Sequence, residues 1–131
     1  MKEFLDFEHD MRFNKIYDEI PLESRKDPKC LSFAYLIAGN KELGKDLIPY
    51  ISPNWERLDY GPEKSILSKE DSVLWDLAKE LLEGYTSFDF KDIFFHLNER
   101  NLDLALNALK YKYNKRVNEI YEAGDYNSYL K

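Results

Sequence analysis

The sequence predicts an all-α protein, a compact bundle of five to six helices in a single domain spanning residues 1–131. Apolar residues recur three and four positions apart along most of the chain, the periodicity of helices that bury one face. The five glycines and five prolines fall where these periodic runs begin or end. The stretch around residues 50–67 lacks the periodicity, so we expect an irregular, ordered loop there.

The first expected helix begins after Asp6 and ends before Pro21. An aspartate at this position accepts hydrogen bonds from the free backbone N–H groups of the first turn, and proline stops a helix. We expect one face of this helix to enter the core. Its apolar residues are Phe7, Met11, Phe13, Ile16, Tyr17 and Ile20.

The second expected helix has the clearest boundaries. Asp27 followed by Pro28 is a start signal, because proline suits the first helical position, and Gly39 with Asn40 is a stop signal. The residues from 28 to 38 are apolar nearly all round, as in a helix that is covered on several sides. We therefore expect this helix to be the buried centre of the protein.

The middle of the chain is less regular. A short helical turn is expected from residue 42 to residue 48, before Pro49. The loop around residues 50–67 that follows has room for one short extended pair. Apolar side chains should hold this loop against the body of the protein: Ile51, Trp55, Leu58 and Tyr60.

Two further helices precede the last one. Ser68 and Asp71 resemble a capping box, and Gly84 is suited to end the helix in a left-handed conformation. The core face of this helix is expected to be Val73, Leu74, Leu77, Ala78 and Leu81. A short helix should then begin near Ser87 or Asp89. It would carry Phe90, Ile93, Phe94 and Leu97.

The last expected helix runs from residue 99 to about residue 123 and has two apolar strips. The broader strip, expected to face the core, is Leu102, Ala105, Leu106, Leu109, Tyr113, Val117 and Ile120. The thinner strip on the opposite side is Leu104, Ala108 and Tyr111. Either the rest of the domain wraps around this helix, or the thinner strip binds a second copy of the chain.

Composition narrows the classes of partner and compartment. The chain has 19 basic and 25 acidic residues, a net charge of −6, which disfavours a nucleic-acid ligand. A single cysteine excludes an internal disulfide framework and multi-cysteine metal sites. The acidic N-terminus lacks the apolar run of a signal peptide, and no segment is apolar enough to cross a membrane. We expect a cytoplasmic protein that binds neither nucleic acid nor membrane.

The two histidines suggest one alternative function, a metal-dependent enzyme. His9 and His96 have carboxylates at helical spacing, namely Asp6, Asp92 and Glu99, so imidazole and acid share one helix face. Acidic neighbours are common in a chain with 34 % charged residues, so we favour ion-paired or capping histidines and expect no metal or other cofactor.

The sequence gives little evidence for a catalytic cysteine or for other known catalytic motifs. Cys30 lies in the first turn of the second helix, where the helix dipole favours a thiolate, but an apolar run begins there and packing in the core is the better interpretation. No phosphate-binding glycine motif, zinc-protease motif, nucleophile elbow or calcium loop is present. The sequence therefore gives no positive support for catalysis.

A cluster of acids supports a binding function instead. Asp76, Glu80 and Glu83 lie close together on one side of the expected fourth helix, which predicts an acidic stripe beside its apolar face. A basic partner surface would complement such a stripe. A second alternative is therefore an acidic inhibitor of a basic partner.

Several segments, residues 7–13, 33–40, 92–94 and 104–109 together with Leu97, resemble a small uncharacterised helical family of Gram-positive bacteria and their phages. That family has no assigned activity, so the resemblance implies no catalytic residues and suggests a phage or mobile-element setting. Where the family has asparagine and glycine near the end of its fourth helix, this chain has Leu82-Glu83-Gly84-Tyr85.

Taken together, these features predict a non-catalytic protein–protein interaction domain. The expected partner is another protein, and a second copy of the chain would form a homodimer. The residues expected to bind it are Asp76, Glu80, Glu83, Leu104, Ala108 and Tyr111.

Overall fold

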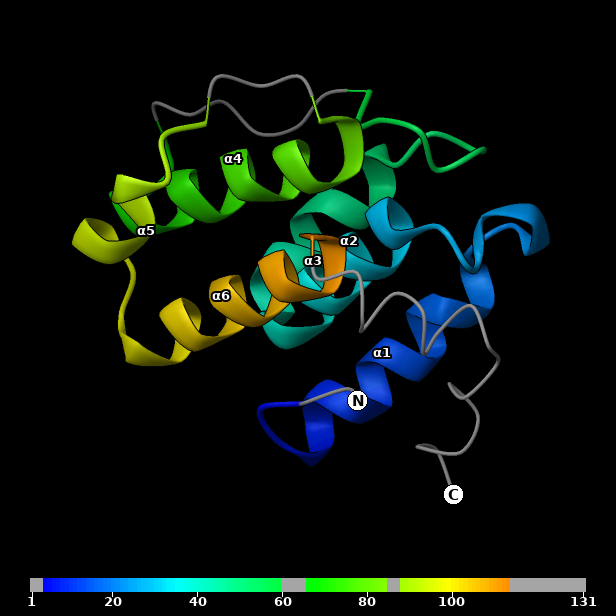
Figure 1. Ribbon diagram of the computed structural model, residues 1–131, viewed down its shortest axis with the longest axis horizontal. Coiled ribbons are helices and arrows are strands. Elements are labelled where there is room, and N and C mark those ends of the chain that lie inside the picture. The colour runs from blue at the N-terminus through cyan, green and yellow to red at the C-terminus, as the bar shows by residue number, and fades with distance from the viewer. Residues whose placement is uncertain (1–3, 60–65, 85–87, 114–131) are drawn as a thin grey trace.

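The computed structural model describes residues 4–59, 66–84 and 88–113. These residues form six α-helices and two short 3-10 helices, and no strand occurs among them, so the predicted all-α bundle is confirmed (Figure 1). The elements are α1 (Phe7–Glu19), η1 (Leu22–Ser24), α2 (Pro28–Gly39), α3 (Lys41–Leu47), η2 (Ile48–Tyr50), α4 (Lys69–Glu83), α5 (Lys91–His96) and α6 (Glu99–Tyr113).

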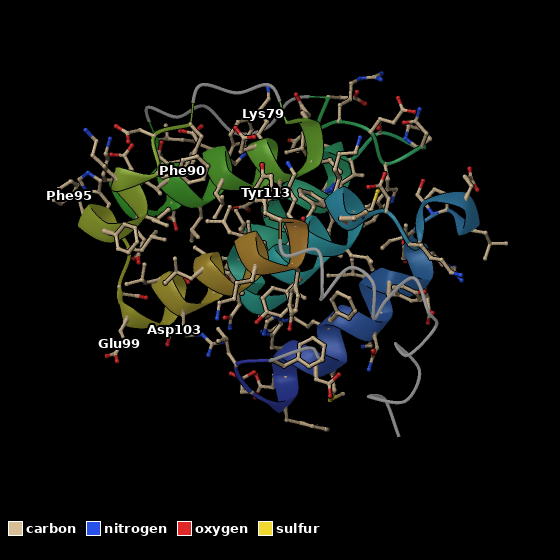
Figure 2. All side chains as sticks on the ribbon, in the orientation of Figure 1. Lys79, Phe90, Phe95, Glu99, Asp103 and Tyr113 are labelled. Carbon is tan, nitrogen blue, oxygen red and sulfur yellow. The ribbon has the colours of Figure 1, made fainter. Side chains whose placement is uncertain are left out.

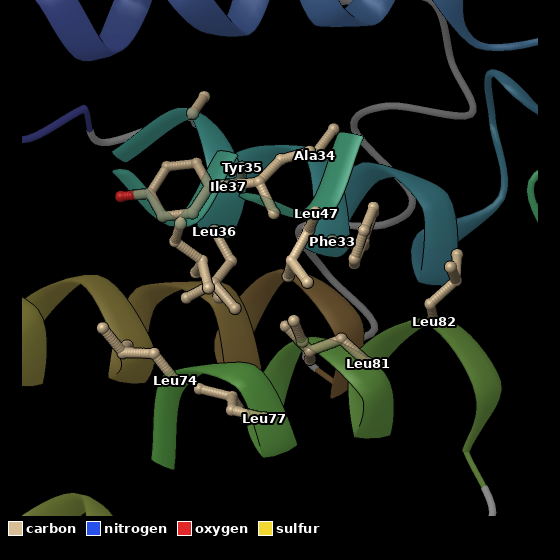
Figure 3. Packing of buried hydrophobic residues seen from close by; sticks show 14 of the residues in the cluster. Phe33, Ala34, Tyr35, Leu36, Ile37, Leu47, Leu74, Leu77, Leu81 and Leu82 are labelled. Atoms are coloured by element: carbon tan, nitrogen blue, oxygen red, sulfur yellow. The ribbon is translucent and has the colours of Figure 1, made fainter. Parts of the chain in front are cut away.

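Helix α2 is the centre of the fold, as its all-round apolar sequence predicts. It packs against α1, α4 and α6, and every residue from Cys30 to Gly39 is buried. Figure 3 shows Phe33 and Leu36 of α2 facing the leucines of α4. Burying a side chain of this size stabilises a protein by roughly 1.5–3 kcal/mol, so α2 is the main source of cohesion.

Side-chain caps define where the helices begin. In five helices, the residue before the helix accepts a hydrogen bond from a backbone N–H group of the first turn, at distances of 2.8–3.0 Å. These residues are Asp6, Asp27, Asn40, Ser68 and Asn98. Gly84 ends α4 with a φ of 76°, a left-handed conformation that glycine adopts without strain. The local start and stop signals of the sequence are thus realised.

The loop after η2 has the expected short extended pair, an antiparallel bridge between Ile51 and Leu58. Within the turn, the Ser52 hydroxyl accepts hydrogen bonds from the backbone N–H groups of Glu56 and Arg57, both at 3.1 Å. Trp55 and Leu58 are buried and hold the turn against the core. Residues 60–65 of the expected loop lie outside the described part of the chain.

Several aromatic and aliphatic residues expected in the core are exposed. Among the apolar residues expected on the first core face, Phe7 and Met11 face solvent, Ile16 and Tyr17 are partly buried, and Phe13 and Ile20 are fully buried. Helix α5 is only six residues long, so Ile93 alone points fully inward from it. Three phenylalanines of this region, Phe90, Phe94 and Phe95, are exposed, and Phe88 is partly buried.

The core face of α6 differs from the expected one, since Ala105 is the only described residue of the broader strip that is completely buried. Leu104, Ala105, Ala108 and Tyr111 are buried, and Tyr113 is 59 % exposed. The remaining leucines of the broader strip, Leu102, Leu106 and Leu109, are only partly buried. Two alanines on the buried side allow α6 to lie close to α2, which a strip of leucines would prevent. The expected continuation from 114 to 123 lies outside the described residues.

Candidate functional site

His9 is a structural residue rather than a ligand or base. Its ring is fully buried, Nδ1 accepts a hydrogen bond from the Leu5 backbone N–H at 3.0 Å, and Nε2 donates to the Tyr35 carbonyl at 2.9 Å. Because a backbone N–H only donates, Nδ1 is the unprotonated nitrogen. Burial lowers the pKa of His9 to about 4, so the ring is neutral at pH 7. Neither nitrogen is available to a metal.

The other residues of the predicted metal site have separate roles. His96 is partly exposed on α5, with Nε2 3.9 Å from Asp92 Oδ1. Asp6 caps α1 and pairs with Arg100 at 3.0 Å, and its pKa is lowered chiefly by the hydrogen bond from the His9 N–H. Glu99 is exposed in the first turn of α6 (Figure 2). Within the described ranges, no three His, Cys, Asp or Glu side chains are grouped where they could hold a metal ion.

Cys30 is buried, as the apolar run around it predicts. Its thiol donates a weak hydrogen bond to the Trp55 carbonyl, with an S···O distance of 3.5 Å. Burial raises the pKa of Cys30 to about 12. The thiol is therefore protonated at neutral pH and its role is packing.

The predicted acidic stripe is not a free surface. Glu80 is buried, and Asp76 and Glu83 are half-buried. The Glu83 carboxylate accepts a hydrogen bond from the Leu58 backbone N–H at 3.0 Å and lies 3.9 Å from Lys79 Nζ. Glu83 thus ties the loop after η2 to α4. The expectation of a continuous exposed stripe was wrong because carboxylates on this side of α4 are covered or used within the chain.

The thinner strip of α6, with Leu104, Ala108 and Tyr111, is also inside the protein. Leu104 and Ala108 are completely buried, and the Tyr111 ring packs edge-on against Tyr35, with centroids 4.6 Å apart. Of the two arrangements that the sequence allows, the domain therefore wraps around this strip. These three residues therefore belong to the core of the chain, and the prediction that they form a partner-binding surface was wrong.

The broader strip instead forms an outward surface, the α6 outer face, which consists of Leu102, Leu106, Leu109 and Tyr113. A wide groove of about 890 Å³ is lined by three of these residues, Leu106, Leu109 and Tyr113. In Figure 2, Asp103 and Tyr113 lie toward opposite ends of α6. The groove is lined by Phe4, Leu5, Phe90, Asp103, Leu106, Asn107, Leu109, Lys110 and Tyr113.

A second concave surface, the α1–α3 groove, has a different character. It is a cavity of about 270 Å³ with a largely apolar floor of Ile16, Ile37, Ile48 and Trp55, beside Gly44. The charged residues around the floor are Arg12, Lys15, Glu19, Lys41 and Lys45. Four of these five are basic, although the chain as a whole is acidic.

Both grooves escaped sequence reasoning for the same physical reason. Their residues come from helices and loops that are brought together only by tertiary packing, so no local sequence pattern reveals either groove. The one local signal was Lys41 and Lys45, four residues apart and so on one face of α3. The α6 outer face was visible in the sequence as a strip, but was assigned to the core.

No family model, curated protein or solved structure matches this chain. Among the described helices, none combines the length and the apolar character needed to cross a membrane.

Proposed function

We propose that the protein is a non-catalytic interaction domain that forms a homodimer through the α6 outer face. The observation that carries this proposal is the apolar strip of α6, in which Leu102, Leu106 and Leu109 are only partly buried and Tyr113 is 59 % exposed, whereas the opposite side of the helix is buried. Contiguous apolar surface beside a groove is typical of a protein interface. His9 and Cys30 fit a non-catalytic role, since their reactive atoms serve packing and backbone hydrogen bonds.

The spacing of the strip favours a second copy as the partner. Leu102, Leu106, Leu109 and Tyr113 are separated by four, three and four residues, the same in both directions along the helix. This is the a/d spacing of a two-helix seam. When two such helices pair antiparallel about a two-fold axis, Leu106 meets the partner's Leu109 and Leu102 meets the partner's Tyr113.

The charges beside the strip support the same arrangement. Asp103 and Lys110 each follow a strip residue directly and are seven residues apart, so they lie on the same flank of α6. Both are exposed, and neither makes an ion pair within the described residues. In the antiparallel dimer Asp103 faces the partner's Lys110, and symmetry repeats the pair. Exposed pairs contribute only about 0–1 kcal/mol each, so they set orientation more than affinity.

Light scattering coupled to size exclusion tests the proposal. We expect the wild-type chain to elute with twice the chain mass and to dissociate on dilution. Leu109→Glu should abolish the dimer, because it places a carboxylate in the seam, and should leave the helical circular dichroism unchanged. Leu22→Glu is the matched control, because Leu22 is exposed on η1, away from both grooves. A wild-type chain that stays monomeric at high concentration would contradict the proposal.

A further inference from the structure

We infer that the α1–α3 groove binds an acidic amphipathic helix of a partner protein, with a large apolar side chain of that helix inserted beside Ile16, Ile48 and Trp55. The groove shares no residue with the α6 groove. Binding of a partner helix in the α1–α3 groove can therefore be tested independently of the homodimer.

The size and lining of the groove favour a side-chain anchor. Its volume of about 270 Å³ lies just below the ~300–1,000 Å³ of pockets that enclose a small molecule, and its floor offers few polar groups to orient one. Ile37 and Trp55 close the bottom of the groove, and Ile48, 44 % exposed, forms part of its open side. A hydrophobic pocket of this kind is typical of an interface hot spot.

Basic residues lie on both sides of the apolar floor of the groove. Arg12 and Lys15 come from α1, and Lys41 and Lys45 come from α3. The three lysines are exposed and make no ion pair with any described residue, whereas Arg12 donates through Nε to the Ala38 carbonyl at 2.7 Å and lies 3.8 Å from the Glu8 carboxylate. A partner helix bound between α1 and α3 could carry carboxylates on both sides of its apolar stripe. These carboxylates would then lie beside the basic residues of the groove.

Two backbone features shape the groove. Gly44 allows α3 to lie against α2, because a Cβ atom there would lie 2.7 Å from the Ile37 carbonyl oxygen. Trp55 has a φ of 58°, a left-handed conformation that is strained for a bulky residue. The hydrogen bonds of the Ser52 turn maintain this conformation, and the Trp55 ring packs edge-on against Phe33 at 5.8 Å. Strain of this kind clusters at ligand-binding positions.

Calorimetric titration with a synthetic helical peptide tests the inference. The probe carries leucine at positions i, i+4 and i+7 and glutamate on both flanks of that stripe. We expect saturable binding that weakens with salt. Combined Lys15→Glu, Lys41→Glu and Lys45→Glu should weaken it by at least about tenfold, since three rim charges contribute up to about 1 kcal/mol each and reversal makes them repulsive.

A matched control separates local from general electrostatics. Lys29→Glu, Lys69→Glu and Lys91→Glu reverse the same number of charges at exposed first-turn positions outside the groove, where a glutamate suits the helix dipole. This control should bind the peptide within about threefold of wild type, because long-range terms are screened by salt. Replacing the probe's leucines with alanine should abolish binding.

Three results would overturn the inference. The first is an absence of peptide binding to the wild-type chain. The second is equal weakening in the groove triple variant and the control triple variant. The third is tighter binding to phosphatidylserine vesicles than to the peptide with the same dependence on the groove lysines, which would identify an anionic membrane surface as the ligand.

Discussion

His9 shows how one buried polar side chain connects distant parts of this fold. Its two ring nitrogens bond to the segment before α1 and to the middle of α2, and its ring packs against Phe4 and Tyr35. A buried imidazole is tolerated only because both nitrogens have partners. Sequence reasoning identified His9 as a candidate for chemistry because nothing local reveals that Tyr35, twenty-six residues away, supplies a carbonyl.

The depressed pKa of His9 predicts a stability that depends on pH. The ordinary pKa of 6.5 applies to the unfolded chain, whereas the folded value is about 4, so the unfolded state binds the proton more readily between these values. The stabilisation is fully present above pH 6.5 and is lost as the pH falls toward 4, by about 3 kcal/mol at most.

Replacing His9 by Phe separates this effect from general acid denaturation. Urea unfolding of His9→Phe at pH 7 should show a loss of about 1–3 kcal/mol, because the Leu5 N–H and the Tyr35 carbonyl lose their partner. The difference from wild type should shrink as the pH is lowered to 4.5. A difference that stays constant across this range would show that His9 does not titrate on unfolding.

At the scale of elements, the sequence predicts where these helices begin, but it does not always predict which face of a helix is buried. Asp6, Asp27 and Ser68 accept hydrogen bonds from backbone N–H groups within three residues of themselves, so the local sequence is enough to predict them. Which strip of α6 is buried depends on what α2 presents. A Cβ atom on Gly39 would lie 2.2 Å from a methyl group of Leu104, so the Leu104 side chain occupies the space that a side chain at position 39 would need.

The two faces of α6 predict opposite responses to truncation. Leu104→Ala should lower the free energy of unfolding by about 2–5 kcal/mol, because it opens a cavity against α2. Leu106→Ala should cost clearly less in the monomer, since Leu106 is only partly buried, and should instead weaken self-association. Chemical denaturation of both variants at low protein concentration, together with light scattering, measures the two effects. Equal losses of stability would contradict the assignment of the faces.

At the scale of the whole molecule, the net charge is acidic, but the charges are unevenly distributed over the surface. Acids such as Glu83 are used to attach loops to helices, whereas the lysines of the α1–α3 groove have no partner among the described residues. The net charge of −6 led sequence reasoning toward an acidic binding surface. The described structure offers a basic groove instead, and composition cannot reveal this because charge distribution depends on the packing of α1 beside α3.

The charges that flank the apolar strip of α6 allow the most direct test of the proposed antiparallel homodimer. Sedimentation equilibrium should show that Asp103→Lys weakens the wild-type dimer by a few-fold, because it places two lysines opposite each other, and that Lys110→Asp does so through paired acids. The double variant, with both charges exchanged, should recover wild-type affinity. If the double variant is weaker than either single variant, or if the wild-type chain does not dimerise, the antiparallel α6 seam is contradicted.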